Sequence, residues 1–393
     1  MSNSIGRRRV LAGAGAGILL GALEGCAAGL MRPPPMPAAA KRLQLPALQA
    51  GSDRITRITV CTRPFRAQGP RLDVERVGAK TIVHNYGHGG SGWSLSWGSS
   101  SIAVRNAMAG GDREIAVIGC GALGLTSALL LQRAGARATI YAKELPPNVR
   151  SSLATGVWSP DSRICLEQHA TPAFKREWET MARQSFQTYQ SYLGLPADPV
   201  EFVDIYGVFD TDPAKRLGTP PSDAKPAFAN LQRELIDDLI PARQEFAPGT
   251  HPFGGRFVRG SSTMMFNLSA YSRLLLADFL ANGGKIEIAE FHAPADLMPL
   301  PQKTLINATG YGARALFGDD SITPVRGQLA HTIPQTDIHY GLAYRQSWLI
   351  PRRDGLVFQF TGEDDYYGYG DDTTMPDRAE AERAVDTIAG LFT

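Results

Sequence analysis

Apolar positions along the chain recur with two spacings, one typical of strands and the other of amphipathic helices. A short apolar run at Glu114–Ile118 enters the glycine-rich residues 119–124, and helical spacing follows over 125–134. A second apolar run covers 138–142. This order predicts a strand, a tight glycine turn, a helix and a second strand, which together form a β-α-β unit of about 30 residues.

The rest of the chain repeats both patterns without an internal repeat of about 20–50 residues. Helical spacing recurs at 172–192, 270–282 and 377–391, and short alternating or apolar runs occur at 201–210, 285–290, 304–308 and 346–361. The mixture predicts an α/β (α+β) fold in which a second, mixed-sheet region accompanies the β-α-β unit.

The first 26 residues have the pattern of an export signal. Arg7, Arg8 and Arg9 precede an apolar run that ends at Leu23. That run is too short to cross a hydrocarbon core of about 30 Å at about 1.5 Å per residue. A basic start before a short apolar stretch is typical of secretory signals, and the paired arginines resemble a twin-arginine signal. We therefore expect an exported protein of the periplasm or cell envelope.

The end of this signal leaves two alternatives open. Leu23-Glu24-Gly25-Cys26 resembles a lipoprotein processing box, which makes Cys26 the lipidated residue and a membrane anchor. Ordinary cleavage near Ala27 is the other alternative. The proline-rich residues 27–50 then predict a linker.

Charge and composition exclude several classes of protein. The chain has 40 Lys+Arg against 38 Asp+Glu and a formal net charge of +2, which argues against nucleic-acid binding. Residues 1–25 hold three arginines and one glutamate, so the slight basicity belongs to the export signal. An apolar content of 43% excludes a disordered chain, and four cysteines do not make a disulfide scaffold.

The glycine turn indicates dinucleotide binding. In G-x-G-x-x-G, Gly119 permits the tight turn, Gly121 lets the backbone approach a pyrophosphate, and Gly124 lets helix and strand pack closely. Ala122 and Leu123 lie in the turn that leads to the expected helix, whose N-terminus offers free N–H groups to phosphate oxygens. A glycine-rich turn without a ligand is the alternative.

Two further segments favour the same interpretation. Glu144 follows the second strand, 20 residues after Gly124, where a carboxylate accepts hydrogen bonds from the unphosphorylated ribose of FAD or NAD; Lys143 precedes it. The segment 306–310 contains Asn307, Thr309 and Gly310 and predicts a buried strand that ends in a glycine turn. Such a strand is typical of FAD-binding proteins of the glutathione-reductase type, although an ordinary strand end has the same pattern.

The run from His84 to Ser94 reads H-N-Y-G-H-G-G-S-G-W-S, and Arg63 to Arg66 reads R-P-F-R. The first resembles the flavin-contacting signature H-N-Y-G-H-G-G-x-G of the D-amino acid oxidase family, and the second resembles that family's R-P-x-R segment. Similar matches occur at 151–158, 324–328 and 349–352. The resemblance covers most of residues 56–391 and implies a Rossmann-like FAD-binding domain with a mixed-sheet substrate domain.

The resemblance implies which residues bind FAD. They are Gly119, Gly121, Ala122, Leu123, Gly124, Lys143, Glu144, Ser151, Ser152, Thr155, Gly156, Asn307, Thr309, Gly310, Gly89, Gly90, Ser91, Gly92, Trp93 and Ser94. His84 and His88 are four residues apart, but the glycines between and after them disfavour a helix, so we expect no metal site.

The order of these motifs departs from the family, in which G-x-G-x-x-G opens the chain and the other two motifs come near its end. A circular permutation explains this, with the old ends joined through 101–113 and new ends cut between the 377–391 helix and the R-P-F-R strand. We expect a two-lobed flavoprotein over 51–393. Its FAD-binding parts are about 78–165 and 300–330, and its substrate-domain parts are about 51–77, 195–295 and 331–393.

The chemistry that the resemblance implies is transfer of a substrate α-hydrogen, as hydride, to the flavin N5. Arg63 matches the family's carboxylate-binding arginine, with Arg66 as its competitor, and Gly90 brings the backbone close to the reacting centre. The family's active-site tyrosines have no counterpart in the loop 252–259. Tyr366 and Tyr367 are the candidates to replace them, unless 363–372 is simply a solvated acidic loop.

The expected function is an FAD-dependent oxidase or dehydrogenase that converts an amino acid, foremost a D-amino acid, or a related amine to an imino or keto acid. A glycine- or sarcosine-type amine oxidase and a catalytically inactive flavin-binding subunit are the alternatives. Expected partners are the amino acid or amine, oxygen or another electron acceptor, and a second copy of the chain in a homodimer. Nucleic acid is not expected.

Overall fold

A computed structural model describes residues 42–215 and 225–392. The expected export signal, Cys26 and the linker up to residue 41 lie outside this part of the chain. Among the residues that are described, no helix is both long enough and apolar enough to cross a membrane.

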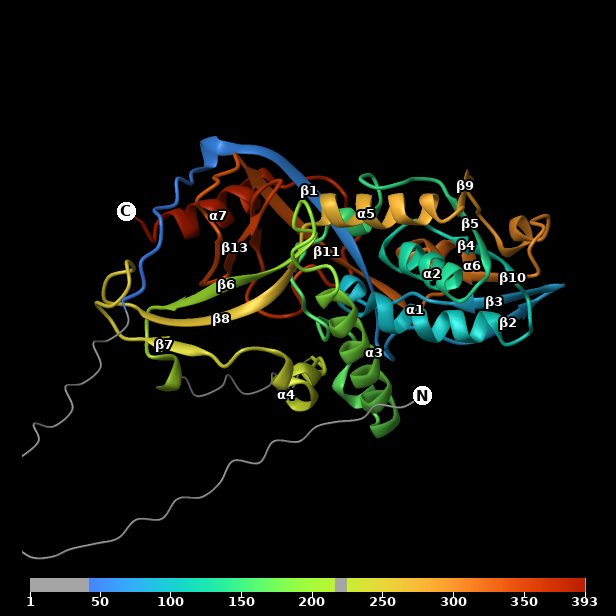
Figure 1. The fold of residues 1–393 in the computed structure, drawn as a ribbon. Helices are drawn as coiled ribbons and strands as arrows, with labels where there is room; N and C mark the ends of the chain where they lie inside the picture. Colours follow the sequence, from blue (N-terminus) through green and yellow to red (C-terminus); the bar gives the residue numbers. More distant parts are fainter. Residues whose placement is uncertain (1–41, 216–224, 393) are drawn as a thin grey trace, which may run out of the picture. The chain divides into compact units, whose positions relative to one another are not determined.

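Two mixed sheets organise the described residues, as the sequence predicts, and they occupy opposite ends of Figure 1. The larger sheet has eight described strands in the order β1-β11-β14-β13-β12-β6-β8-β7, and only the β12–β6 pair is parallel. Its strands are β1 (Ile55–Arg66), β6 (Val200–Phe209), β7 (Gln244–Phe246), β8 (Phe257–Phe266), β11 (Ile322–Thr332), β12 (Tyr340–Tyr344), β13 (Ser347–Arg352) and β14 (Gly355–Phe360).

The smaller sheet has six described strands in the order β2-β3-β10-β4-β5-β9, parallel except for the β2–β3 pair. They are β2 (Val74–Val77), β3 (Lys80–His84), β4 (Glu114–Ile118), β5 (Arg137–Ala142), β9 (Lys285–Ile288) and β10 (Thr304–Asn307). Both faces are covered: Val117 and Ile306 join one buried cluster, whereas Ala116 and Leu305 join another. Burial on both faces explains why these strands are continuously apolar.

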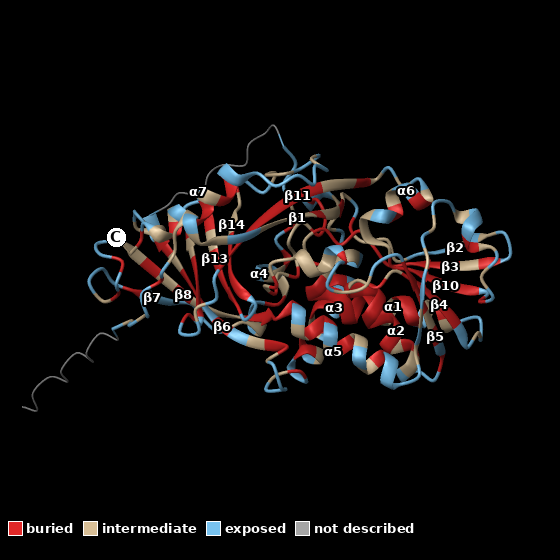
Figure 2. Ribbon diagram, turned by 90° about the horizontal axis from the view of Figure 1, so that it is seen from above, coloured by how far each residue is buried: buried red, intermediate tan, exposed pale blue. Residues whose placement is uncertain are grey.

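Helices cover both sheets. α1 (Gly92–Met108), α2 (Ala122–Arg133), α3 (Pro172–Gln190) and α5 (Leu268–Ala281) form the large buried cluster beside the smaller sheet, which is red in Figure 2. α7 (Arg378–Ala389) packs on the larger sheet. α4 (Leu231–Leu235) and α6 (Ala313–Phe317) are short. The connections hold the 3-10 helices Ser52–Arg54, Arg150–Leu153, Glu167–His169, Pro213–Lys215, Asp237–Leu239, Pro294–Leu297 and Gly310–Gly312.

The hydrophobic pattern locates most elements correctly. The expected helices at 172–192, 270–282 and 377–391 correspond to α3, α5 and α7, and the β-α-β unit corresponds to β4, α2 and β5. The expected strand at 346–361 is two strands, β13 and β14, because the chain turns at Arg353 and Asp354. Three strands belong to a sheet other than the one expected. β2 and β9 lie in expected substrate-domain segments but belong to the smaller sheet, whereas β11 lies mostly in an expected FAD-binding segment but belongs to the larger sheet.

Residues 42–50 differ from the expected free linker. Leu48 is buried, and Leu43 and Leu45 pack against the cluster beneath α7. The Leu43 N–H donates to the Thr250 carbonyl at 2.8 Å, and the Tyr340 hydroxyl donates to the Pro46 carbonyl at 2.6 Å. Burial of Leu48 and partial burial of Leu43 and Leu45, together with these hydrogen bonds, stabilise the segment on the folded chain.

Candidate active site

A cavity of about 440 Å³ lies where parallel strands of the smaller sheet end. Its lining includes Ile118 at the carboxyl end of β4, Ala142 at that of β5, and Ala308 directly after β10. The opposite wall comes from β1 of the larger sheet and from the glycines before α1. Ligands of open parallel sheets bind at this edge, and the volume falls in the ordinary range for cofactor and substrate sites.

The glycine turn forms one wall of this cavity. Gly119 has a φ of +108°, and a Cβ there would lie 2.6 Å from the Ala308 carbonyl oxygen. A Cβ on Gly124 would collide with the Gly119 carbonyl, so Gly124 packs the helix on the strand and does not itself line the cavity. Gly121, Ala122 and Leu123 do line it. The cavity therefore faces the start of α2, which is the cradle that a dinucleotide pyrophosphate requires.

The end of β5 forms the far side of the cavity. Lys143 and Glu144 line it, as expected, and Glu290 and His292 face them from the segment after β9. The Lys143 ammonium lies 3.3 Å from a Glu290 carboxylate oxygen in a solvent-exposed ion pair. The Glu144 carboxylate stands at the place where the sequence predicts a ribose partner.

Residues 149–156 divide into lining and supporting residues. Ser151 and Thr155 line the cavity, and the Ser151 hydroxyl oxygen accepts from the Ala122 N–H at 3.1 Å. Gly156 lies outside the cavity, where a Cβ would lie 2.5 Å from the Phe266 carbonyl oxygen, and Ser152 also lies outside it. The absence of a side chain on Gly156 makes room for the backbone of Phe266, and flavin contacts at Ser152 and Gly156 stay a prediction.

The H-N-Y-G-H-G-G segment faces the cavity through four of its expected residues. Gly89, Gly90, Gly92 and Trp93 line it. Side chains on Gly89 and Gly90 would collide with residues 162 and 163, so a protein turn already requires these two glycines.

The serines of the same segment face the protein instead. The Ser91 hydroxyl donates to the Ser162 carbonyl at 3.1 Å, and the Ser94 hydroxyl accepts from the Ser159 N–H at 2.8 Å. Neither serine lines the cavity. Both hydroxyls connect α1 to the 159–162 turn, and flavin contacts at Ser91 and Ser94 stay a prediction.

His88 presents an acceptor without a partner. The imidazole is fully buried and lines the cavity. Its Nε2 lies 2.7 Å from the Ser99 hydroxyl, which donates its own proton to the Asn85 side-chain oxygen. Nε2 therefore carries the ring proton, and Nδ1 is an acceptor with no partner among the described residues. Burial lowers the pKa of His88 to about 3, so the ring is neutral at neutral pH.

Arg63 enters the cavity wall from β1. Within the described residues it donates one hydrogen bond, from Nη1 to the Arg326 carbonyl at 3.2 Å. A Cβ on Gly327 would lie 2.6 Å from Arg63 Nη2, so the absence of a side chain on β11 makes room for the guanidinium. The sequence identifies Arg63, but the role of Gly327 depends on the antiparallel pairing of β1 with β11.

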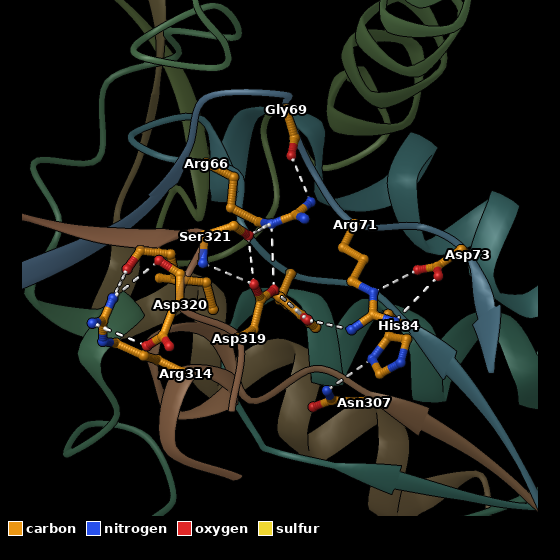
Figure 3. Close-up of polar contacts among 12 residues, drawn as sticks. Arg66, Gly69, Arg71, Asp73, His84, Asn307, Arg314, Asp319, Asp320 and Ser321 are labelled. Atoms are coloured by element: carbon orange, nitrogen blue, oxygen red, sulfur yellow. Dashed lines mark hydrogen bonds and ion pairs between the residues drawn. The ribbon is translucent and has the colours of Figure 1, made fainter. Parts of the chain in front are cut away.

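Arg66, the competitor of Arg63, does not line the cavity. Its Nε donates to the Ser321 hydroxyl at 2.8 Å and lies 3.4 Å from an Asp319 carboxylate oxygen (Figure 3). Arg66 is therefore committed to a structural polar network.

Arg163 is a residue that the sequence patterns miss. It has a φ of +49°, which is uncommon for a residue with a side chain, and its backbone packs against Gly89. Its guanidinium donates to the Asp365 carbonyl at 2.6 Å. Burial, followed by the nearby Arg63 charge, lowers the pKa of Arg163. No motif surrounds Arg163, so only the folded chain places it beside Arg63.

Tyr366 and Tyr367 do not line the cavity, in contrast to the expectation that they replace the family's active-site phenols. The Tyr366 hydroxyl donates to the Pro226 carbonyl, and the Tyr367 ring packs edge-on against Phe360. Burial, followed by the nearby Glu380 carboxylate, raises the pKa of Tyr367 to about 12. Both phenols are therefore engaged in the loop beside the larger sheet. Among the described residues, no three His, Cys, Asp or Glu side chains gather as a metal site.

Comparisons with known proteins agree with this geometry. The family described as "FAD dependent oxidoreductase" matches residues 114–393. The D-amino-acid oxidase of Rubrobacter xylanophilus is 27% identical over 283 residues, which cover 70% of this chain and 76% of the relative. That of Streptomyces coelicolor is 26% identical over 287 residues, which cover 71% and 78%.

Solved structures with a similar fold include iminodiacetate oxidase from Chelativorans sp. BNC1 and glycine oxidase from Bacillus cereus ATCC 14579. The first has a TM-score of 0.47 and 16% identity over 70% of this chain and 78% of its own. The second has a TM-score of 0.40 and 13% identity over 63% and 70%. The match of the family to most of the chain and the glycine cradle at the cavity lead to one conclusion: the chain belongs to the family of FAD-dependent oxidoreductases.

Proposed function

We propose that the chain oxidises an amino acid, foremost a D-amino acid, to the corresponding imino acid. The observation that carries this proposal is the guanidinium of Arg63 in the wall of the cavity, beside the glycine-lined segment 89–92. The D-amino-acid oxidases among the relatives support the same substrate class.

Arg63 is suited to hold a substrate carboxylate. A guanidinium binds a carboxylate through two parallel hydrogen bonds, which fix orientation as well as position. The hydrogen bond to the Arg326 carbonyl and the space beside Gly327 hold the guanidinium before substrate arrives. Such preorganisation lowers the entropic cost of placing the α-carbon for reaction.

The cofactor that the family implies is FAD, and the described residues fit it. The glycine turn and the start of α2 would hold the pyrophosphate, Glu144 the ribose, and the backbone of Gly89 and Gly90 the redox-active ring. His88 Nδ1 offers one acceptor to a bound group in the same cavity. Bound FAD supplies a two-electron acceptor for the substrate α-hydrogen, and oxygen or another oxidant then takes the electrons.

Anaerobic mixing with matched amines tests this function. D-Alanine, L-alanine, glycine, sarcosine and ethylamine share an amine on a small carbon skeleton, but ethylamine lacks the carboxylate. We expect loss of the oxidised flavin absorbance with D-alanine and none with ethylamine. Equal bleaching by ethylamine would contradict the carboxylate clamp, and no bleaching with any amine would favour an inactive flavin-binding subunit.

We also propose that the chain is a circular permutant of its family. The family match begins at residue 114, whereas R-P-F-R and H-N-Y-G-H-G-G precede it. The η1 helix at Ser52–Arg54 contacts α7, where Arg378 donates to the Ser52 carbonyl at 3.0 Å. Leu48 and Leu391 also belong to one buried cluster, which supports a short connection between the two ends. A reordered chain that starts at residue 114, ends at residue 113 and joins 392 to 42 through a short linker is expected to bind FAD with unchanged affinity; loss of folding would contradict the proposal.

The proposed location is the periplasm or cell envelope, reached by twin-arginine export. Replacing Arg8 and Arg9 by lysine is expected to leave the protein in the cytoplasm, as fractionation of expressing cells would show. Mass spectrometry of the mature N-terminus tests the anchor, because a non-lipidated terminus at residue 27 or later would exclude lipidation of Cys26.

A further inference from the structure

A partly buried polar chain runs from Glu75 through His84 to Asn307, and Figure 3 shows its contact between His84 and Asn307. His84 ends β3 and is fully buried. Its Nε2 lies 2.9 Å from a Glu75 carboxylate oxygen on β2, and its Nδ1 lies 3.1 Å from the Asn307 amide nitrogen on β10. The H-N-Y-G-H-G-G motif includes His84, but its side chain does not line the cavity.

The directions of these hydrogen bonds follow from Asn307. Its side-chain oxygen accepts from the Thr309 N–H at 3.2 Å and from the Thr309 hydroxyl at 2.7 Å. The amide nitrogen therefore faces His84, and an amide nitrogen only donates. His84 Nδ1 is consequently an acceptor, and the ring proton lies on Nε2, which donates to Glu75. The chain is satisfied only while His84 is neutral.

The far end of this chain fixes part of the cavity. The residues directly after Asn307, which are Ala308, Thr309 and Gly310, all line it. The Ala308 carbonyl lies against Gly119, so this turn and the glycine loop are in direct contact. The Asn307 carbonyl also accepts from the Asn85 N–H at 2.8 Å, which holds β10 to the residue after His84. A displaced Asn307 side chain would remove the two hydrogen bonds that hold Thr309 in this turn, which lines the proposed cofactor site.

We propose that His84 is a positioning residue for FAD: in its neutral form it holds Asn307 and the 308–310 turn in place, and its protonation weakens FAD binding. A protonated ring would direct an Nδ1–H at the Asn307 N–H groups. Rotation of the Asn307 amide would relieve that repulsion, but it would leave the Thr309 N–H and hydroxyl without their acceptor. This inference rests on FAD binding alone and is independent of the amine substrate.

The surroundings of His84 favour the neutral ring. Burial is the largest influence and lowers the pKa of His84, and the Arg71 charge lowers it further, whereas Asp73 and Glu75 raise it. Arg71 also donates to the Glu75 carboxylate at 3.0 Å, so Arg71 and His84 share this acceptor. The remaining neighbours from other elements are the rings of Tyr86 and Phe317, packed edge-on against the imidazole. The net pKa is below the ordinary 6.5.

The sign of the effect follows from linkage. Because the arrangement that holds FAD excludes the proton on Nδ1, His84 binds that proton more readily when the turn is released. FAD affinity should therefore be full above the ordinary histidine pKa of about 6.5 and should fall as the pH drops below it.

Titration of apoprotein with FAD at pH 7.5, 6.5 and 5.5 tests the proposal, with flavin fluorescence as the readout. For the wild type we expect Kd to rise about tenfold from pH 7.5 to 5.5, the worth of one or two buried hydrogen bonds. His84→Gln keeps an acceptor and a donor but does not titrate, so its Kd should stay within about threefold of wild type at pH 7.5 and vary less with pH. His84→Phe keeps the aromatic contacts but neither hydrogen bond, and should bind about tenfold more weakly at pH 7.5.

Two further variants separate positioning from general destabilisation. Glu75→Gln keeps an oxygen acceptor but removes a charge that raises the His84 pKa, so the fall in affinity should move to lower pH. His331→Gln is the matched control, because His331 is another buried histidine of lowered pKa, located on β11 of the larger sheet and outside the cavity lining. It should leave the FAD titration unchanged.

The outcomes decide the proposal even if His84→Phe fails to fold. A wild-type affinity that does not change with pH would overturn it. So would a pH dependence that is the same in wild type and His84→Gln, or an unmoved curve in Glu75→Gln. Loss of the dependence in His84→Gln with retained affinity at pH 7.5 would support it, since a merely structural histidine would change affinity at every pH alike.

Discussion

The two sheets contribute to the cavity in different ways. In the smaller sheet the contributing residues follow the carboxyl ends of parallel strands, so short local segments such as 119–124 carry both the turn and its function. In the larger sheet the contribution of Arg63 depends on Gly327, a residue of another strand far along the chain. The glycine turn at the cofactor end is therefore encoded in one short segment, whereas the proposed substrate end is encoded by long-range pairing.

The largest effect is expected from Gly327→Val, which sharpens this difference. A side chain there would occupy the space of the Arg63 guanidinium. We expect kcat/KM for a D-amino acid to fall about 100-fold, because the charge-assisted hydrogen bonds from Arg63 to the substrate carboxylate would be lost. The Kd of FAD should stay within about twofold. Gly255→Ala is the control, since no atom lies within 4 Å of a Cβ at that glycine. Equal losses of FAD affinity and activity in Gly327→Val would break the separation of the two ends.

A change in the glycine turn should have the opposite signature. Gly124→Ala places a Cβ against the Gly119 carbonyl, so the helix must move away from the strand. We expect FAD affinity to fall more than about tenfold, in line with the cost of overpacking. Gly110→Ala is the control, because Gly110 does not line the cavity and no atom lies within 4 Å of a Cβ there, so this variant should bind FAD normally. Fluorescence titration of both apoproteins would measure the contrast, and similar affinities would contradict it.

The effect of acid on folding stability can be compared at two buried histidines, one at the cavity and one in the larger sheet. Burial lowers the pKa of His88 at the cavity to about 3 and that of His331 on β11 to about 4. Both neutral rings therefore contribute stability above the ordinary pKa of about 6.5, and this contribution is lost as the pH falls from there toward 3 or 4.

Thermal unfolding between pH 7.5 and 4 measures this loss. The Tm of the wild type should fall on acidification, and it should fall less in both His88→Gln and His331→Gln, since glutamine does not titrate. The same dependence in the wild type and both variants would show that other groups control acid stability.

The smallest effects are expected at the tyrosines beside the larger sheet. Tyr366 and Tyr367 lie outside the cavity lining, and their rings pack on Phe228 and on Phe360 of β14, respectively. Phenylalanine at either position should change kcat/KM by less than about twofold. A loss above about tenfold with intact FAD binding would return these phenols to the reacting centre.

Local patterns predict the β-α-β unit, α3, α5 and α7, because hydrophobic periodicity and glycine spacing act over a few residues. They also identify Arg63, since its motif is a contiguous segment. They do not predict Gly327 or Arg163, whose positions depend on the pairing of β1 with β11 and on the turn that packs against Gly89. Local patterns also miss the packing of residues 42–50. Their proline-rich composition predicts a linker, and the surface on which the three leucines pack forms only in the folded chain.

The central claim is that Arg63 holds the carboxylate of an amino acid beside the flavin. Its most direct test is the concentration dependence of anaerobic flavin reduction by a D-amino acid in Arg63→Leu, with Arg66→Leu as the matched control. We predict that Arg63→Leu retains FAD and needs at least about 100-fold more substrate for half-maximal reduction, whereas Arg66→Leu changes little. An unchanged substrate requirement in Arg63→Leu would contradict the claim.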